Sequence, residues 1–548
     1  MPWQTWYGVL RNAIRGIGGL LSDAYTDGNV KKIGDITLVP QPNDSPHDPL
    51  NWPSLTKNVL LMVIALASGV TVSLGPMISP GLPLLAMEYQ KSLDVISTYL
   101  VGLFILWTGA FTFFTSAAAS VWGKRVVFVL SAAALLALNA WGAFVKSFEE
   151  FVVMRLLQGF ASAPFETLVT STIQDLFFVH ERGGKLAIWG LMLTSGVLLG
   201  QVISGVIIER LGVKYTFGIS ALIFIPLLIA TFFFVPETVY HRGEVLKTVE
   251  LADGEKNQTT ITIRSAEFGN SQSSKYAVFR GRVSNESFFK QLIKPFPLFV
   301  CPAVVFGSFI YGSFFTWLVA LSVLSVPMFS APPYNLTPSQ VGLTNLPLLA
   351  TGLLGAPASG WMADKVIRSM AKRNNGVYEP EFRLTLMAIG ALLSTIGFFG
   401  LGATIDAGAP IAWPLTFISL HSLAIPFASQ AAYTYVVDCH PDDANQAFVT
   451  IGLVKSLLAF LATTSVNGWF QAQGAKTVFW SIGGLNLGLC ALTIPMYIFG
   501  KRFRGLVARK ISTRMSNQCV VLAKRRTFQT PKPQSSVVDT TVEPLSLP

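Results

Sequence analysis

Charge is scarce in this sequence. Asp, Glu, Lys and Arg together make up 13% of the 548 residues, whereas 51% of the residues are hydrophobic and the mean hydropathy is +0.52. A soluble domain covers its surface with about 25% charged residues. Half of that density leaves most of the surface without charged side chains, so we expect that surface to face lipid. The composition excludes an ordinary soluble enzyme or binding module.

Motifs of enzymes, pumps and channels are also missing. No GxxxxGK[ST] loop is present to hold a nucleotide, and nothing resembles the selectivity filter of a channel. The net charge of +11 comes from basic residues in loops and tails, a pattern set by membrane topology and not by nucleic-acid binding. The cysteines lack CxxC spacing, which argues against disulfides and a metal site; they are Cys301, Cys439, Cys490 and Cys519. We therefore expect no enzymatic activity, metal, cofactor or nucleic-acid partner.

Long apolar runs dominate the chain. A bilayer core of ~30 Å takes about 20 apolar residues as helix, and helix is expected because an open strand edge cannot be satisfied in lipid. Twelve runs of this kind occur, at 58–86, 95–119, 126–145, 151–175, 185–208, 215–236, 298–328, 341–363, 384–404, 411–437, 446–470 and 477–500. They predict an all-α membrane protein whose twelve transmembrane helices form two pseudo-symmetric six-helix halves.

The runs divide the chain into five predicted parts. These are an N-terminal segment 1–57, a first six-helix bundle 58–236, a polar linker 237–297, a second bundle 298–500 and a basic tail 501–548. Lys and Arg number eighteen in the connections on the side of the N-terminus and linker, and five on the other side. Positive charge marks cytoplasmic loops, so both termini are expected in the cytoplasm. Asn335-Leu336-Thr337, in the outer loop after span seven, is a glycosylation sequon.

Polar residues inside the spans are the candidate functional groups, because ionisable groups in a bilayer are costly. In span four, Arg155, Gln158, Ser162 and Glu166 fall on one face of the helix. This stripe is typical of the wall of an aqueous cavity. Glu166, near the middle, is a candidate proton carrier or partner of a cationic substrate. Arg155 could instead extend its side chain to the outer interface.

Other spans add polar and aromatic candidates with open alternatives. Lys455 in span eleven is a partner for Glu166 or for an anionic substrate, or a lysine that reaches the inner face. His421 is a titrating group or a buried structural histidine. Two glutamines, Gln201 and Gln430, orient substrate or form hydrogen bonds between neighbouring helices. Three aromatic residues, Tyr311, Trp317 and Tyr433, line a pocket or pack in the core.

Several short motifs carry a resemblance to a known family. They are Asp48-Pro49-Leu50-Asn51-Trp52, Arg155-Leu156-Leu157-Gln158-Gly159, His180-Glu181-Arg182-Gly183, Pro236-Glu237-Thr238, Gly360-Trp361-Met362-Ala363-Asp364-Lys365 and Glu379-Pro380-Glu381-Phe382-Arg383-Leu384. In this order and at these topological positions they resemble the major facilitator superfamily, specifically the fungal branch of its twelve-span drug/proton antiporters. The resemblance covers most of the chain.

The resemblance implies roles for two repeated loops. After spans two and eight the family has a motif that latches the two halves, and it maps to Gly123, Lys124 and Arg125 and to Gly360, Asp364 and Lys365. The acidic position of the first copy is Ser120, so we expect a weaker latch there. The resemblance also implies a proton-coupling role for Arg155.

Span five departs from the family's antiporter signature. Gly196, Gly200 and Gly205 are present and permit close helix packing. Gln201 and Ser204 replace the expected proline and glycine, which argues against drug antiport.

The function expected from these patterns is transport. The resemblance and the aromatic content favour proton-coupled efflux of a small hydrophobic organic compound across the plasma membrane. The altered span five and Glu166 favour the alternative, proton-coupled uptake of a polar or cationic nutrient such as a polyamine. In both cases the partners are a small molecule, protons and the lipid bilayer, the proton gradient supplies the energy, and the protein is a monomer.

Overall fold

The fold is helical, as the apolar runs predict. A computed structural model describes residues 32–33, 36–37, 45, 48–240, 277–279, 281–284, 286–374, 378–440 and 443–505. Most of the predicted linker 237–297 and tail 501–548 lies outside these residues. Apart from helices, the described part contains two short antiparallel strands, β1 (Lys32–Ile33) and β2 (Ile36–Thr37).

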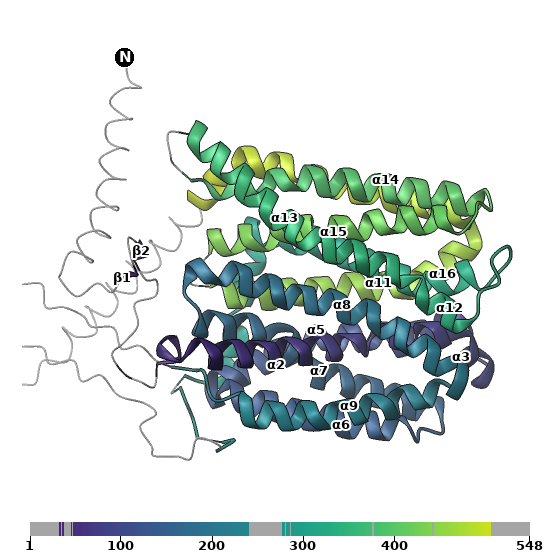
Figure 1. Ribbon diagram of the computed structural model, residues 1–548, viewed down its shortest axis with the longest axis horizontal. Coiled ribbons are helices and arrows are strands. Elements are labelled where there is room, and N and C mark those ends of the chain that lie inside the picture. Colours follow the sequence, from purple (N-terminus) through teal and green to yellow (C-terminus); the bar gives the residue numbers. More distant parts are fainter. Residues whose placement is uncertain are drawn as a thin grey trace, which may run out of the picture. The chain divides into compact units, whose positions relative to one another are not determined.

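The helices of the first half run from η1 to α9 (Figure 1). Their bounds are η1 (Pro49–Asn51), α2 (Ser54–Ser73), η2 (Pro76–Gly81), α3 (Leu82–Glu88), α4 (Leu93–Ser97), η3 (Thr98–Gly102), α5 (Leu103–Trp122), α6 (Lys124–Gly142), α7 (Phe148–Leu176), α8 (Val179–Leu211) and α9 (Val213–Phe234). The first span is α2, η2 and α3 together, and its prolines convert the middle of the span into a 3₁₀ turn.

The second half begins with a short helix before its first span. Its elements are α10 (Phe288–Ile293), η4 (Phe296–Val300), α11 (Pro302–Phe329), α12 (Pro338–Leu343), α13 (Asn345–Arg373), η5 (Pro380–Thr385), α14 (Leu386–Asp406), α15 (Ala412–Cys439) and α16 (Ala444–Ala491). The chain from Ile498 onward forms a separate unit, of which 498–505 is described as helix.

The described helices account for the twelve predicted spans. Ten are long and apolar enough to cross a membrane by length and hydropathy. One of the ten, Ala444–Gly505, contains two helices that meet at Gly474, where the backbone leaves the helical region with φ 75°. Helix α7 is long enough to span but is not among the ten, because its polar stripe lowers its hydropathy; it adds a further span. The described chain thus has twelve spanning helices.

Glycine marks the sharp breaks between consecutive spans. Gly123 (φ 98°) separates α5 from α6, and Gly212 (φ 100°) separates α8 from α9. Only glycine adopts this backbone region without strain. Ser147 begins α7 by accepting a hydrogen bond from the Glu150 N–H, as helix-capping serines do.

The two halves repeat the same packing. In the first half α2 packs against α8, α5 against α7, and α6 against both α7 and α9. In the second half α11 packs against α16, α13 against α15, and α14 against both α15 and α16. Each pair recurs six spans later, which is the parallel repeat expected from an internal duplication.

The halves touch along two seams, α5 with α16 and α8 with α12 and α13. We call the end of the bundle where α5 meets α6 the linker end, and the end where α8 meets α9 the far end. At the far end the seam is tight: a Cβ atom at Gly205 would lie 2.7 Å from the Pro338 carbonyl oxygen, and one at Gly342 would lie 2.6 Å from that of Gln201. The Asn467 amide also donates to Ser97 Oγ across the other seam, at 3.1 Å.

At the linker end, several glycines of α8 and α13 face open space. Cβ atoms at Gly183, Gly184 and Gly190 on α8, and at Gly360 on α13, would meet no described atom within 4 Å. Helix α8 is therefore in backbone contact with α12 at the far end, whereas several glycines of α8 and α13 at the linker end face open space.

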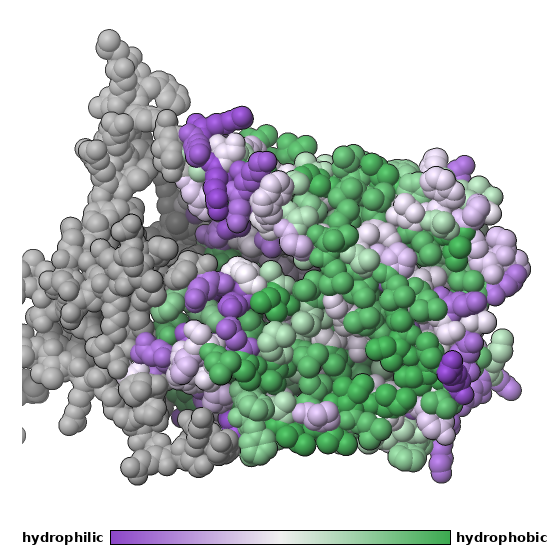
Figure 2. Space-filling model, viewed as in Figure 1, coloured by the Kyte–Doolittle hydropathy of each residue, from purple (hydrophilic) through white to green (hydrophobic). Residues whose placement is uncertain are grey.

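The outer surface matches a bilayer. Figure 2 shows hydrophobic side chains across the middle of the bundle and hydrophilic ones toward its two ends. Exposed leucines lie on spans of both halves, for example Leu130, Leu222, Leu354 and Leu392. Hydrophobic residues on such a surface are stabilised by lipid and not by burial in protein.

The seam between α8 and α2 gives a first prediction. A Cβ atom at Gly196 would lie 2.0 Å from the carbonyl oxygen of Gly69, and backbone cannot give way as a side chain can. We expect Gly196→Ala to destabilise the protein by about 1–3 kcal/mol through overpacking. The measurement is the thermal unfolding of purified protein in nanodiscs.

Gly190→Ala is the matched control for this prediction. It lies on the same helix with open space around its Cβ position, and it should leave the unfolding midpoint unchanged or raise it. Equal behaviour of the two variants would contradict the close packing of α2 and α8.

Candidate functional site

A pocket of about 160 Å³ lies between the two halves. Helices α7 and α8 of the first half and α11, α13, α15 and α16 of the second contribute its walls. It extends from the middle of the spans to Gly183 and Leu186 near the start of α8, at the linker end. Such a site at the interface of two repeats is where transporters of repeated architecture bind substrate.

One ion pair stands in the wall of this pocket. Glu166 of α7 pairs with Lys455 of α16, and the two side chains are only 13% and 5% exposed. The Lys455 ammonium also lies 4.2 Å from the centroid of the Phe315 ring. Glu166 and Lys455 are the only carboxylate and the only ammonium among the described residues that line the pocket. Each half thus contributes one of the two charges.

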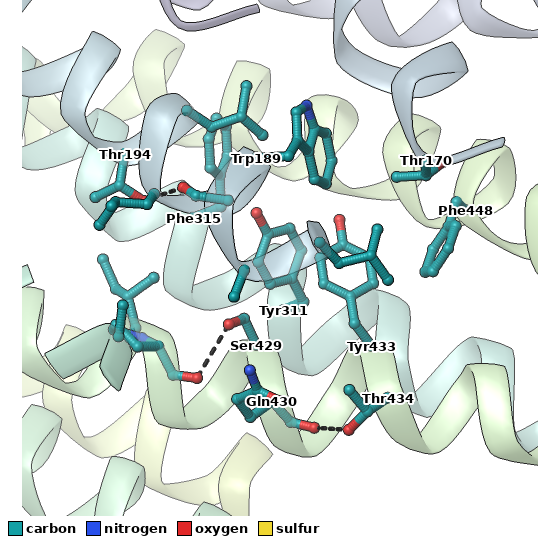
Figure 3. Close-up of a pocket in the computed structure, with 18 of the residues that line it drawn as sticks. Thr170, Trp189, Thr194, Tyr311, Phe315, Ser429, Gln430, Tyr433, Thr434 and Phe448 are labelled. Carbon is teal, nitrogen blue, oxygen red and sulfur yellow. Dashed lines mark hydrogen bonds between the residues drawn. The ribbon is translucent and has the colours of Figure 1, made fainter. Parts of the chain in front are cut away.

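Two tyrosines form an aromatic wall of the pocket. The rings of Tyr311 (α11) and Tyr433 (α15) lie 4.2 Å apart, and Phe448 packs edge-on to Tyr433 at 5.0 Å. Figure 3 shows the two tyrosine hydroxyls directed toward Trp189, which comes from α8 in the other half. A flat organic molecule between these rings would contact both halves.

Hydroxyl and amide groups complete the lining. Ser429 Oγ donates to the Pro426 carbonyl at 3.0 Å, and Thr194 Oγ1 donates to the Gly190 carbonyl at 3.1 Å (Figure 3). Their protons are used within their own helices, so these oxygens offer lone pairs to a ligand. Gln430, which lines the same wall, can offer both a donor and an acceptor.

Arg155 does not line the pocket. Its side chain is fully buried, and it donates to the carbonyl oxygens of Leu74 (2.9 Å), Gly75 (3.2 Å) and Leu100 (2.6 Å). Its guanidinium also stacks on Phe104 at 4.4 Å. These carbonyls belong to the break after α2 and to η3, where the helical hydrogen-bond pattern is interrupted. Arg155 satisfies them, so the cavity-lining prediction is corrected to a structural contact.

Gln158 belongs to the same buried network. Its Oε1 accepts from Arg155 at 2.6 Å, and its amide donates to Asn139 Oδ1 at 2.9 Å. All three side chains are fully buried and lie away from the pocket. The helical phase placed Gln158 on the same face as Glu166, but the far-end half of that face packs against α2, α5 and α6.

Three further candidates are packed outside the pocket lining. His421 Nδ1 and Ser394 Oγ form a hydrogen bond of 2.9 Å, and the imidazole lies between the rings of Phe314 and Phe398. Trp317 is buried against Phe398, six residues along α11 from Tyr311 and hence on another face. Gln201 is buried and donates to the Val197 carbonyl of its own helix. None of the three is among the residues of the pocket wall.

The first copy of the predicted latch is tied to its own half. The carboxylate of Glu237 accepts the backbone N–H groups of Lys124 and Arg125, each at 3.1 Å, and so caps the first turn of α6. A residue larger than glycine does not fit at position 123, because its Cβ atom would lie 2.2 Å from this carboxylate. The Lys124 ammonium pairs with Asp175 at the end of α7 at 2.6 Å.

The second copy differs from the sequence prediction. Gly360, Asp364 and Lys365 lie within α13, which continues to Arg373, and not in a loop after residue 363. The extension consists largely of good helix formers, and Lys372 in the last turn favours the helix end. The ion pair that matches Lys124–Asp175 is Arg383–Asp438, six spans later.

Other predicted positions are placed as follows. Gly196 and Gly200 on α8 approach α2, at Gly69 and Ser73, and Gly205 approaches α12. Asn335 is exposed in the loop between α11 and α12 at the far end, with a positive φ of 50°. Its glycosylation stays a prediction.

Several pocket residues do not follow from the sequence patterns. They are Phe315, Phe448, Trp189 and Ser429. A signal was available for Phe315, which follows Tyr311 by four residues and therefore lies on the same face of α11.

Comparison with known proteins identifies the family. The sequence profile of the Major Facilitator Superfamily matches residues 60–463, which is more than half of the chain. The chain belongs to the major facilitator superfamily. Solved members have the same fold: the proton:xylose symporter XylE superposes with a TM-score of 0.58 at 16% identity, covering 82% of this chain and 96% of that structure.

Fungal members of the superfamily are similar over nearly the whole chain. An uncharacterized MFS-type transporter, C1271.10c of Schizosaccharomyces pombe, is 24% identical over 88% of this chain and 90% of its own length. The MFS-type transporter penM of Penicillium rubens is 25% identical, covering 88% and 92%. The efflux pump radE of Floropilus chiversii is 22% identical, covering 84% and 83%. The chain is therefore a secondary transporter of the superfamily type and not an enzyme.

The Arg155 network gives a second prediction. Lysine keeps the charge but lacks the fork that reaches three carbonyls, so Arg155→Lys would leave buried acceptors unpaired. We expect a loss of at least about 3 kcal/mol in unfolding free energy. Thermal unfolding of the purified protein measures it, with Arg210→Lys at the exposed end of α8 as the control. A variant that unfolds like the wild type but no longer transports would contradict the structural role.

Proposed function

We propose that this chain is a proton-coupled exporter of a small, uncharged or amphipathic aromatic compound. The observation that carries the proposal is the Glu166–Lys455 pair, which joins the two halves in the wall of an otherwise aromatic and apolar pocket. The cargo would lie between Trp189 and the tyrosine pair, and the proton would bind Glu166.

Coupling follows from the electrostatics of the pair. Two opposite charges near contact attract by about 4 kcal/mol at an effective dielectric constant of 20. A proton on Glu166 removes this attraction and leaves the Lys455 charge buried beside the Phe315 ring. Because the two residues belong to different halves, protonation changes the energy of holding the halves together at the centre. Alternating access requires a switch of this kind.

The open end of the pocket is compatible with export. The pocket reaches Gly183 and Leu186 at the linker end, while α8 and α12 are in backbone contact at the far end. Basic residues gather in connections at the linker end, which supports a cytoplasmic location for that end and for both termini. The cargo would then enter from the cytoplasm. The relative radE is named an efflux pump, which supports export.

Uptake of a cationic nutrient is the second candidate. Glu166 and the faces of Tyr311 and Tyr433 are groups that attract an organic cation. However, Lys455 already neutralises Glu166, so a cation would have to displace a buried ammonium. The paired state therefore favours an uncharged cargo. The pocket is complete within one chain, which supports a monomer, and we propose the plasma membrane as its location.

Glu166→Gln tests the coupling. We expect the wild type reconstituted in proteoliposomes to move cargo at a rate that changes across pH 5–8, and the variant to lose both proton-driven accumulation and this pH dependence. Glutamine cannot release or take up the proton. Flux is measured with a panel of uncharged fluorescent aromatic compounds under an imposed proton gradient.

Two controls accompany this experiment. Glu166→Gln combined with Lys455→Met removes both charges and avoids a lone buried ammonium, so it should fold even if the single variant is unstable. Lys214→Met breaks the exposed Lys214–Glu88 pair at the far end and should leave transport unchanged. Proton-driven accumulation that survives in the folded double variant would refute the role of Glu166.

Direction is tested in inside-out membrane vesicles. With the interior acidified, an exporter should accumulate a compound of the panel inside the vesicle in exchange for protons. If compounds accumulate only in right-side-out vesicles with an acidic exterior, the protein is an importer. The same assay with spermidine as the probe examines the second candidate.

A further inference from the structure

The structure holds a second, smaller cavity next to Glu166. It measures about 30 Å³, and its lining includes Thr71, Thr108, Ser162, Glu166, Phe315 and Val319. A cavity needs roughly 10–15 Å³ of this kind to hold one water molecule, so there is room for one or two. From this cavity we propose that Glu166 receives its proton on the far-end side, through water positioned by Thr71, separately from the substrate pocket. The inference rests on the proposed proton coupling.

The cavity lies on the far-end side of Glu166. Along α7, Ser162 is one turn before Glu166 and lines the small cavity, whereas Thr170 is one turn after it and lines the pocket. Along α11, which runs in the opposite direction, Val319 lines the small cavity and Tyr311 the pocket. Glu166 thus has one cavity toward each end of the bundle.

A single layer of side chains separates the two cavities. Val72, Glu166, Val197 and Phe315 line both of them. Three of these four are apolar and cannot carry a proton. Any proton that crosses the layer therefore passes through the Glu166 carboxylate, beside the Phe315 ring.

Thr71 provides the polar group of the small cavity. Its side chain is fully buried, and its hydroxyl has no hydrogen-bond partner among the described residues. Buried hydroxyls are nearly always satisfied by protein or by ordered water. The other two hydroxyls of the cavity are already used as donors, Ser162 to the Gln158 carbonyl at 2.7 Å and Thr108 to the Phe104 carbonyl at 2.8 Å. Thr71 alone can both donate to and accept from a water beside Glu166.

The titratable groups around Glu166 leave it as the proton acceptor. Among the described residues that line the two cavities, the others that titrate are Lys455, Tyr311 and Tyr433, all on the pocket side. Helices α2, α5 and α8 contribute no ionisable side chain to the small cavity. Arg155, three turns along α7, is occupied by backbone carbonyls.

The transfer itself is simple. A protonated water gives up one O–H bond, a bond forms between that proton and Glu166 Oε, and a neutral water remains. The proton thus reaches Glu166 on its far-end side, whereas the cargo enters the pocket from the linker end. Thr71 acts as a positioning residue for the water and not as a proton carrier.

Infrared difference spectroscopy tests the role of Thr71. The full-length protein in nanodiscs is subjected to an acid pH jump, and the carbonyl stretch of protonated Glu166 is followed in time. The band is assigned by its loss in Glu166→Gln. We expect Thr71→Val, which keeps the shape but removes the hydroxyl, to slow the appearance of the band by about tenfold or more. Thr71→Ser should restore the wild-type rate.

Thr172→Val is the matched control for this change. Thr172 is a buried threonine on α7 outside both cavities, and its hydroxyl donates to the Leu168 carbonyl. It should leave the rate unchanged. Wild-type kinetics in folded Thr71→Val would overturn the inference while leaving the coupling role of Glu166 intact. If no band is lost in Glu166→Gln, the proposed coupling itself fails, and the cavity inference with it.

Phe315→Ala offers a second measurement that does not require the Thr71 variants. Removing the ring joins the two cavities, so water can reach past the layer. We expect pyranine-loaded proteoliposomes with Phe315→Ala to acidify at least about tenfold faster than wild-type ones without any cargo, because a carboxylate in contact with water on both sides can take up and release protons. Adding Glu166→Gln should abolish this leak. A leak that is equal in Phe315→Ala and the wild type would show that the layer is not the barrier.

Discussion

A bilayer does not solvate charge, and the pairing of Glu166 with Lys455 follows from that constraint. Neither residue could stand alone in the middle of a span without a large cost in free energy. Pairing inside one half would satisfy both charges but would have no mechanical consequence. Because the partners come from α7 and α16, the same contact that makes the charges tolerable also connects the halves. The pocket, the small cavity beside it and the opening at the linker end are all arranged around this contact.

The other buried polar groups meet the same constraint in a different way. Arg155 reaches from α7 to main-chain carbonyls of the first span, and His421 reaches from α15 to the Phe314 carbonyl of the seventh, at 3.3 Å. Fourth and tenth spans occupy matching places in the two halves, so each half contains one such contact between equivalent helices. These contacts stabilise irregular or closely packed backbone. They explain why ionisable residues occur in spans without lining the pocket.

Much of the fold could be predicted from the sequence, because apolar run length and glycine breaks are local properties. The twelve spans and the six-plus-six repeat follow from them, and the relation of Glu166 to Lys455 was one of the stated alternatives. The site was predicted less well. Helical phase says which face Arg155 and Glu166 share, but not that the break after α2 and η3 present carbonyl oxygens to one end of that face. Similarly, nothing local distinguishes Trp317, which packs on Phe398, from Tyr311, which lines the pocket.

The division of the ion pair between two halves limits how the protein can diverge. A substitution at Glu166 or Lys455 alone leaves an uncompensated charge in the membrane, so the two positions can change only together. Tyr311, Trp189 and Phe448 also line the pocket but carry no formal charge, so a substitution at any of them leaves no charge unpaired. Single substitutions can therefore reshape the pocket wall while the ion pair between the halves stays in place.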